Sequence, residues 1–338
     1  MTRKYWDGEK EVYVIPRYYD GEQFIPVRTG YKKGHVLPIE QTSPVQSSIF
    51  RAQYHLQNHI APVSGVDIDS SGNIYTGTSN RVIRKFDSNG NLLWNVQRHT
   101  IGISCLRVGK NEHVITGGND FYLRETLPNG TQGWSILRHS NWVNSIAIDN
   151  NGNIISGGQD RKVLKVSQQG DFIWENISGD GSIQSVTVNS LNQVIAASAD
   201  NFVRKYAESG ELLQSANAGS VIRDVSVAQD DTIYVVTANR TIRQYDSNLT
   251  FLSEVSMAPL TPNLIRCNAG YIYVVTTNGH IYKSEFNQSP IGKFSKNTET
   301  ITDFVLKNNS MLFGTINGLV KQVEDIVEII GYKLMSVN

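Results

Sequence analysis

Short apolar runs separated by polar turns alternate along most of the chain. The clearest example lies between residues 141 and 177, where apolar runs at 143–148, 154–156, 162–166 and 172–177 are divided by turns rich in Asn, Asp and Gly. These turn residues tolerate the positive φ angles that tight hairpins need. The pattern therefore predicts a four-stranded antiparallel meander in this stretch.

The same pattern recurs at a period of 40 or 39 residues from near His59 to the C-terminus. Equivalent turn positions carry Asn80, Asp120, Asp160, Asp200, Asn239, Asn278 and Asn317. An aliphatic residue follows three positions later, and the next turn and strand carry a glycine (Gly90, Gly130, Gly170, Gly210) and a tryptophan (Trp94, Trp134, Trp174). Repeats of this length with four short strands each indicate a β-propeller. We predict an all-β fold in which residues 59–338 form a seven-bladed propeller of four-stranded antiparallel blades.

The first 46 residues follow a different pattern, a short tandem repeat. Tyr5-Trp6-Asp7-Gly8 returns as Tyr18-Tyr19-Asp20-Gly21, and an alternating apolar segment follows each unit. Each unit predicts a small hairpin with an Asp-Gly turn, too small to bury its own aromatic residues. We therefore interpret residues 1–46 as an arm that anchors the chain to a partner protein; a decorated edge of the propeller is the alternative. The expected contacts of the arm are its aromatic residues: Tyr5, Trp6, Tyr13, Tyr18, Tyr19, Phe24 and Tyr31.

Residues 47–58 connect the arm to the first repeat and allow two structures. Ser47 or Ser48 would cap a short helix, whereas the apolar residues between Ile49 and Leu56 would suit a strand that helps to close the ring. The C-terminal run 326–334 also reads as a strand. We favour this run as the fourth strand of the last blade, which would leave every blade complete in sequence. A blade shared by both ends of the chain is the alternative.

Composition and charge narrow the class of protein. Lys plus Arg equals Asp plus Glu at 31 each among 338 residues, so the formal net charge is zero and the chain has no overall attraction for nucleic acid or an anionic membrane. No apolar run reaches the roughly 20 residues of a membrane helix. The start MTRKYWDGEK lacks the apolar segment of a secretory signal. We expect Cys105 and Cys267, which lie in separate apolar runs, to be small buried hydrophobic residues.

The polar side chains that could carry chemistry fall on repeat positions. His59, His99 and His139 share one position, where a hydrogen bond to the Asn or Asp turn of the same blade is favoured over a metal site. Three carboxylates fall at turn positions, where an Asp side chain accepts a hydrogen bond from the backbone N–H two residues later. These are Asp120, Asp160 and Asp200. No spacing marks a Ser/His/Asp set, and no Gly-Lys-Ser loop is present. We predict no catalytic residue, no cofactor and no metal, and hence a non-enzymatic protein.

Two further sets of residues are candidates for contacts. Basic residues directly follow the aliphatic repeat position at Arg84, Arg124, Arg204, Arg243 and Lys321, joined by Lys85, Lys165 and Lys205. We expect their stems to pack between blades with their heads on acceptors of the neighbouring blade; a positive ring for an anionic ligand, such as a phosphate-rich cell-wall polymer, is the alternative. Aromatic residues at turn edges suit ligand or partner contacts as well as packing between blades: Phe121, Tyr122, Trp142 and Phe202.

The first three repeats resemble the WD-repeat and PQQ-like propeller families. His99 and His139 stand where WD repeats place the His of a Gly-His pair, and Asp120 and Asp160 stand at their turn Asp. Phe86-Asp87 occupies the place of Trp-Asp. The chain departs from the WD pattern because an arginine precedes each of these histidines and the later repeats lack the histidine. The resemblance implies a propeller over residues 59–338, and it implies no cofactor.

The paired aromatic-Asp-Gly units resemble segments at the start of tail and baseplate proteins of phages that infect Gram-positive bacteria. The resemblance covers residues 1–31 and implies that the arm docks the chain to the virion. We therefore expect a structural protein of a phage tail tip, baseplate or fibre, made in the host cytoplasm and present in repeated copies in a symmetric assembly. Its partners would be other virion proteins and a host cell-wall glycan, with no nucleic acid and no membrane insertion. The alternatives are a propeller scaffold for protein partners in the bacterial cytoplasm and a propeller enzyme with an unrecognised site.

Overall fold

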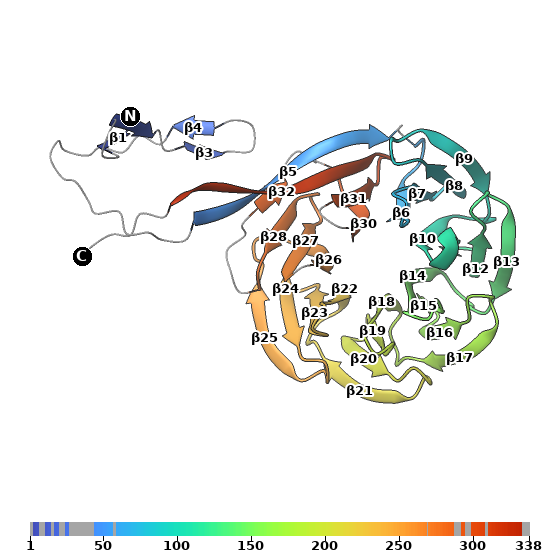
Figure 1. The fold of residues 1–338 in the computed structure, drawn as a ribbon. Helices are drawn as coiled ribbons and strands as arrows, with labels where there is room; N and C mark the ends of the chain where they lie inside the picture. Colours follow the sequence, from blue (N-terminus) through green and yellow to red (C-terminus); the bar gives the residue numbers. More distant parts are fainter. Residues whose placement is uncertain are drawn as a thin grey trace.

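Seven four-stranded antiparallel sheets form a ring around a central channel in the computed structural model of the chain (Figure 1). The structure describes residues 59–268, 270–286, 299–307 and 310–323 in full, and the strand backbone at 3–6, 11–14, 17–19, 24–26, 44–56, 292–294 and 324–332. The predicted seven-bladed propeller is confirmed. Within these residues, no helix has both the length and the apolar character needed to cross a membrane.

The first three blades follow the repeat strand by strand, from the channel outwards. Blade 1 contains β6 (Val63–Ile68), β7 (Ile74–Thr78), β8 (Val82–Phe86) and β9 (Leu92–Gln97). Blade 2 contains β10 (Ile103–Val108), the short 3₁₀ turn η1 (Lys110–Glu112), β11 (Val114–Gly118), β12 (Tyr122–Thr126) and β13 (Gln132–Leu137). Blade 3 contains β14 (Val143–Ile148), β15 (Ile154–Gly158), β16 (Lys162–Val166) and β17 (Phe172–Ile177).

Blades 4 to 6 repeat this order. Blade 4 contains β18 (Ile183–Val188), β19 (Val194–Ser198), β20 (Phe202–Tyr206) and β21 (Leu212–Asn217). Blade 5 contains β22 (Ile222–Val227), β23 (Ile233–Thr237), β24 (Thr241–Tyr245) and β25 (Phe251–Ser256). Blade 6 contains β26 (Pro262–Asn268), β27 (Tyr271–Thr276), β28 (Ile281–Ser284) and β29 (Gly292–Phe294).

The core lies between neighbouring blades. Every residue of the second strands β7, β11, β15 and β19 is buried, because each of these strands is covered on both faces by adjacent blades. Glycines in these strands mark the narrowest contacts, as a Cβ at Gly157 would overlap Ile183 of the next blade. Gly157 is therefore a strand glycine at a close contact between two blades. Cys105 is buried as expected, whereas Cys267 is only partly buried.

Both ends of the chain close the ring, and our preferred prediction for this closure is wrong. Blade 7 contains β30 (Ile301–Lys307), β31 (Ser310–Thr315) and β32 (Val320–Tyr332), and its outer strand is β5 (Pro44–Leu56) from the N-terminal side. The pairing of β32 with β5 runs from Val320 and Leu56 to Tyr332 and Pro44. Residues 326–332 continue the third strand because no turn-forming pair of residues interrupts β32. Residues 47–56 form a strand and not a helix.

Two tandem hairpins form in the arm. β1 (Arg3–Trp6) pairs with β2 (Glu11–Val14), and β3 (Arg17–Tyr19) pairs with β4 (Phe24–Pro26). The register is equivalent in both, with Tyr5 opposite Val12 and Tyr18 opposite Ile25. The backbone thus confirms the predicted hairpins. The side chains expected to make the contacts of the arm lie outside the described residues: Tyr5, Trp6, Tyr13, Tyr18, Tyr19, Phe24 and Tyr31.

Candidate interaction face around the channel

The loops that enter the inner strands and the turns between second and third strands lie at one end of every blade. In an antiparallel meander these two connections share an end, and hydrogen bonds join them. Gln159 N donates to Trp142 O at 2.8 Å in blade 3, and Asn119 N donates to Gly102 O at 2.8 Å in blade 2. We call the surface formed by these connections in all seven blades the loop face.

Two buried histidines lie beneath the loop face and are hydrogen-bonded through both ring nitrogens. His99 Nδ1 bonds Asp120 Oδ1 at 2.7 Å and its Nε2 bonds Thr116 Oγ1 at 2.9 Å, all within blade 2. His139 makes the equivalent bonds to Asp160 at 3.0 Å and to Ser156 at 2.8 Å. The predicted same-blade hydrogen bond is therefore confirmed at both positions. Within the described part of the chain, no group of three His, Cys, Asp or Glu side chains is placed to hold a metal.

The turn carboxylates also act as predicted. Asp160 Oδ1 accepts from Lys162 N at 3.2 Å and Asp200 Oδ1 accepts from Phe202 N at 3.1 Å, which holds each turn closed. Burial opposes ionisation of Asp120, but bonds from His99, Thr100 N and Arg124 outweigh it and hold its pKa below the usual range. Asp120 and its equivalents are therefore ionised supports of the turns.

His59 departs from the pattern because blade 1 has Asn80 at the turn position. Its Nδ1 bonds the guanidinium of Arg84, which is an N–H donor, so the ring is held in its neutral form. Burial, with the Arg84 charge, lowers the pKa of His59 to about 4. The expected bond to Asn80 is thus replaced by an arginine contact.

Basic residues after the aliphatic position divide into two groups. The guanidinium groups of Arg124 and Arg204 each reach a carboxylate of their own blade at 2.6 Å, Asp120 and Asp200 respectively, so the prediction of a neighbouring-blade acceptor is wrong for them. In each blade the aspartate lies in the turn and the arginine four residues later on the strand that follows, so the two side chains meet within one blade. Two lysines do reach the next blade: Lys85 contacts Glu112 at 3.3 Å and Lys205 donates to Ser247 O at 2.8 Å. These contacts support a structural role over an anion-binding ring.

The four candidate aromatic residues all lie at the loop-face end of their blades, but only Trp142 is well exposed. Its side chain is 44% exposed, whereas Phe121, Tyr122 and Phe202 are partly buried. Arg124 covers the Tyr122 ring at 4.2 Å, and Arg204 covers Phe202 at 5.1 Å. The structure therefore offers Trp142 for contacts and uses two of the other rings for packing.

Sequence reasoning missed several aliphatic residues on the loop face. Ile60 is 91% exposed, and Ile101, Ile316 and Val221 are 55%, 48% and 41% exposed. Ile316, Ile60, Ile101 and Trp142 belong to the consecutive blades 7, 1, 2 and 3, and we call them the apolar arc. The available signal was an apolar residue inside a loop, where the repeat otherwise has polar residues.

The channel beneath the loop face is polar, and two arginines that line it are ion-paired. A cavity of about 280 Å³ is lined by inner strands and includes Arg107 and Arg266. Arg107 bonds Asp303 at 2.8 Å, and Arg266 bonds Asp224 at 2.6 Å and Asp303 at 3.4 Å. Burial opposes the charge of Arg107, but Asp303 outweighs it and raises the pKa of Arg107. The result is a chain of ion pairs that joins blades 2, 5, 6 and 7 across the channel.

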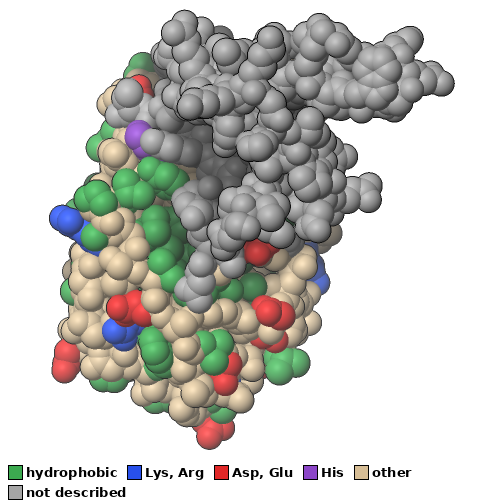
Figure 2. Space-filling model, turned by 90° about the vertical axis from the view of Figure 1, so that its left-hand side faces the viewer, with side chains coloured by type: hydrophobic (Ala, Val, Ile, Leu, Met, Phe, Trp, Pro, Cys, Tyr) green, Lys and Arg blue, Asp and Glu red, His purple; other side chains and the backbone are tan. Residues whose placement is uncertain are grey.

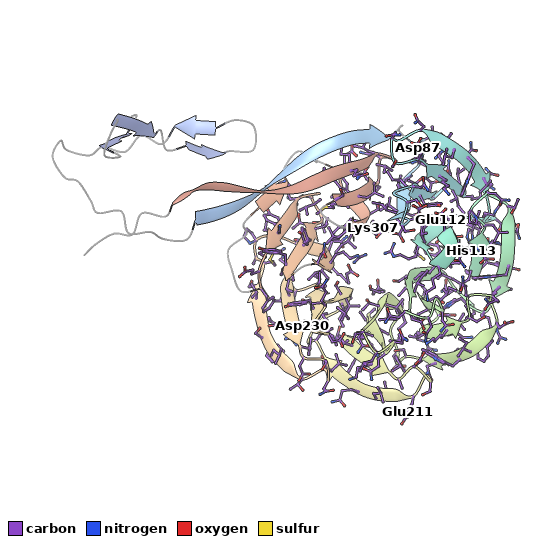
Figure 3. All side chains as sticks on the ribbon, in the orientation of Figure 1. Asp87, Glu112, His113, Glu211, Asp230 and Lys307 are labelled. Carbon is purple, nitrogen blue, oxygen red and sulfur yellow. The ribbon has the colours of Figure 1, made fainter. Side chains whose placement is uncertain are left out.

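The opposite face has its own polar mouth, formed by the inner hairpin turns. A cavity of about 500 Å³ there is lined by residues that include Lys110, Glu112 and Lys307. Figure 3 shows Lys307 and Glu112 on the channel side of the ring and Asp87 and Glu211 on its outside. Lys307 Nζ donates to Ile68 O at 2.9 Å, which links blade 7 to blade 1.

Apolar pairs also recur at the start of the outer strands, on the rim of the ring. Figure 2, which views the side of the ring that carries β25, shows hydrophobic side chains at the surface. The exposed residues of these pairs, each between 41% and 53% exposed, are Leu92, Leu93, Phe172, Ile173, Leu212, Leu213, Phe251 and Leu252. They are spread around the circumference, whereas the apolar arc is gathered on one face.

The comparison with protein families agrees with this geometry. Residues 130–164 match the WD domain, G-beta repeat family. The matched stretch is shorter than one repeat and contains His139, Ser156 and Asp160, the hydrogen-bonded set of blade 3. Propellers of WD repeats generally bind other proteins. The chain matches no curated protein.

Proposed function

We propose that this protein is a non-enzymatic binding platform whose loop face docks a partner protein. The observation that supports this function is the apolar arc, because its four large apolar side chains are exposed on the loop face of four consecutive blades. Several exposed apolar residues on one face of a rigid scaffold are typical of protein-binding surfaces. The WD-repeat match at residues 130–164 supports the same function.

Site-specific photo-crosslinking tests this proposal. A benzophenone amino acid is placed at Trp142 or Ile101 on the loop face and, as a matched control, at Leu191, which is 66% exposed in an inner hairpin turn on the opposite face. In cells of the source organism we expect a discrete crosslinked protein from Trp142 and Ile101 and none from Leu191. Equal crosslinking from all three positions, or none from the loop face, would reject the platform.

We further propose that the tandem hairpins of the arm anchor the chain in a phage virion, at the tail tip, baseplate or fibre. The two hairpins share one register, as expected for a duplicated docking unit. Their resemblance to the N-terminal segments of phage tail proteins supports this assignment, which makes the chain a virion component beside other structural proteins.

Deletion of residues 1–43 tests the anchor and spares β5, which begins at Pro44. We expect the deleted chain to fold with the same melting temperature as the full chain and to be absent from purified particles. A matched control exchanges the two hairpin units, which should retain incorporation because their registers are equivalent. Normal incorporation of the deleted chain would contradict the anchoring role.

A further inference from the structure

We propose that the partner segment held by the loop face is an acidic peptide with aliphatic side chains. This inference rests on the proposed function and adds the chemistry of the partner. It comes from three arginines, Arg81, Arg161 and Arg240, which stand at equivalent turn positions in blades 1, 3 and 5 and are exposed.

The backbone at these arginines is the first observation. All seven turns between second and third strands place one residue at positive φ, and two blades use Gly279 and Gly318 there, both at φ 80°. The arginines adopt φ values of 80°, 69° and 70°. A side chain in this conformation costs about 1–2 kcal/mol that glycine avoids. A non-glycine residue in this conformation is uncommon, and such strained positions cluster at sites that contact ligands.

The charge of the loop face is the second observation. The carboxylates of the turns are already occupied, since Asp120 and Asp200 bond Arg124 and Arg204. Among the described residues of the loop face, Asp180 is the exposed carboxylate near these arginines, with its oxygen 3.6 Å from Arg161. Although the whole chain is neutral, the exposed charge around the channel mouth is therefore mainly positive.

The arrangement of both features selects a peptide over a nucleic acid. The apolar arc runs through blades 7, 1, 2 and 3, and Arg81 and Arg161 belong to blades within it. A phosphate backbone has no group that would bury Ile60, Ile101 and Ile316, whereas leucine or isoleucine side chains between carboxylates match both features. Complementary charge around a buried apolar centre also gives specificity and fast association.

Selection from a random peptide library on the full-length protein tests the inference. We expect the enriched peptides to combine Asp or Glu with Leu or Ile. On the triple variant Arg81→Glu, Arg161→Glu, Arg240→Glu, the acidic peptides should bind at least about tenfold more weakly, because like charges then face each other. The variant Arg81→Lys, Arg161→Lys, Arg240→Lys keeps the positive charge and a non-glycine residue at positive φ. It should bind the acidic peptides within about threefold of wild type. Thermal melting of each variant checks folding, and salt titration of one acidic peptide on the wild type gives a readout that needs no variant.

Each outcome separates the partner chemistry from the platform itself. The enriched peptides could lose binding when Trp142 is substituted and yet show no excess of Asp or Glu. That result would overturn the inference about acidic peptides and still support the loop face as a binding platform. Binding of acidic peptides that is insensitive to salt and to the triple Glu variant would overturn it as well. Single-stranded DNA that displaces the peptides with equal affinity would replace the peptide by a nucleic acid. Failure to enrich any peptide would count against both proposals.

Discussion

The same histidine position in three blades has two different chemical settings. His99 and His139 bond an aspartate on one ring nitrogen and a hydroxyl on the other. His59 faces Arg84 instead, and its Nε2 has no hydrogen-bond partner among the described residues. A protonated ring at His59 would be buried beside a guanidinium without an acidic partner. The surroundings of His59 therefore disfavour the charged form of its ring.

His59 should make the stability of the propeller depend on pH. Its folded-state pKa is about 4 against an ordinary value of 6.5, so the unfolded chain binds a proton that the folded chain does not. The free energy of unfolding therefore falls as pH decreases from 6.5 to 4, by up to about 3 kcal/mol from this residue. Urea denaturation of His59→Gln across this range should show a smaller slope against pH than wild type. An unchanged slope would show that His59 is not the group responsible.

Residues at positive φ in the inner hairpin turns also carry side chains that join neighbouring blades. Gly72 and Gly152 occupy this position in blades 1 and 3, but blade 4 has Asn192 at φ 59° and blade 5 has Asp231 at φ 62°. Asn192 Oδ1 accepts from Asn150 N at 2.9 Å, and Asp231 accepts from Ser190 N at 2.9 Å. In both cases the acceptor reaches back to the preceding blade. The backbone strain is offset there by a hydrogen bond between blades.

At the scale of the strand, the tryptophans of the outer strands lock each blade to the next. Trp134 Nε1 donates to Gln168 O at 3.0 Å, and Trp174 Nε1 donates to Glu208 O at 2.9 Å. Each ring lies against the glycine that follows in the same turn, and a Cβ at Gly170 would lie 2.8 Å from Trp134 Cγ. The Gly and Trp repeat positions are therefore two halves of one contact between neighbouring blades.

Gly170→Ala should destabilise the propeller more than an alanine at a glycine of similar φ. Gly170 and Gly72 have φ values of 87° and 84°, but a Cβ at Gly72 would meet Ser88 at an ordinary 3.4 Å. We expect about 1 kcal/mol for Gly72→Ala, from the backbone alone, and about 2–4 kcal/mol for Gly170→Ala, which must also displace Trp134. Urea denaturation measures both. Equal losses would mean that the tryptophan ring moves aside freely.

Most strands and turns could be predicted from the sequence, because the same apolar and turn residues recur at equivalent positions of the repeats. The strands of blade 3 begin and end within two residues of the apolar runs, and Asp160 takes its turn role. Contacts between blades could not be predicted, since the partner of Trp134 depends on how adjacent sheets are inclined. The apolar arc was missed for a related reason: its members are single loop residues, and the blades that carry Ile316 and Ile60 become neighbours only once the ring has closed.

At the scale of the whole molecule, the ring depends on a strand from the opposite end of the chain. β32 lies between β31 and β5, and β5 also lies against β29 of blade 6. Sequence patterns could not decide this closure, because residues 47–56 and 326–332 both read as strands and either could have been outermost. The arrangement ties the N-terminal arm directly to the closing strand, so a force on the arm would act on the blade that holds the ring shut.

Deletion of residues 1–56 should therefore open the ring, whereas deletion of residues 1–43 should not. The longer deletion removes β5 and leaves the edge of β32 unpaired, which exposes backbone donors and acceptors and favours aggregation. We expect its melting temperature to fall by at least about 5 °C relative to the shorter deletion, since the loss of a paired strand costs several kcal/mol. A synthetic peptide of residues 44–56 added in trans should restore part of this loss by occupying the same edge. A peptide of the same composition in scrambled order controls for nonspecific binding. Equal melting temperatures for the two deletions would show that blade 7 closes without β5.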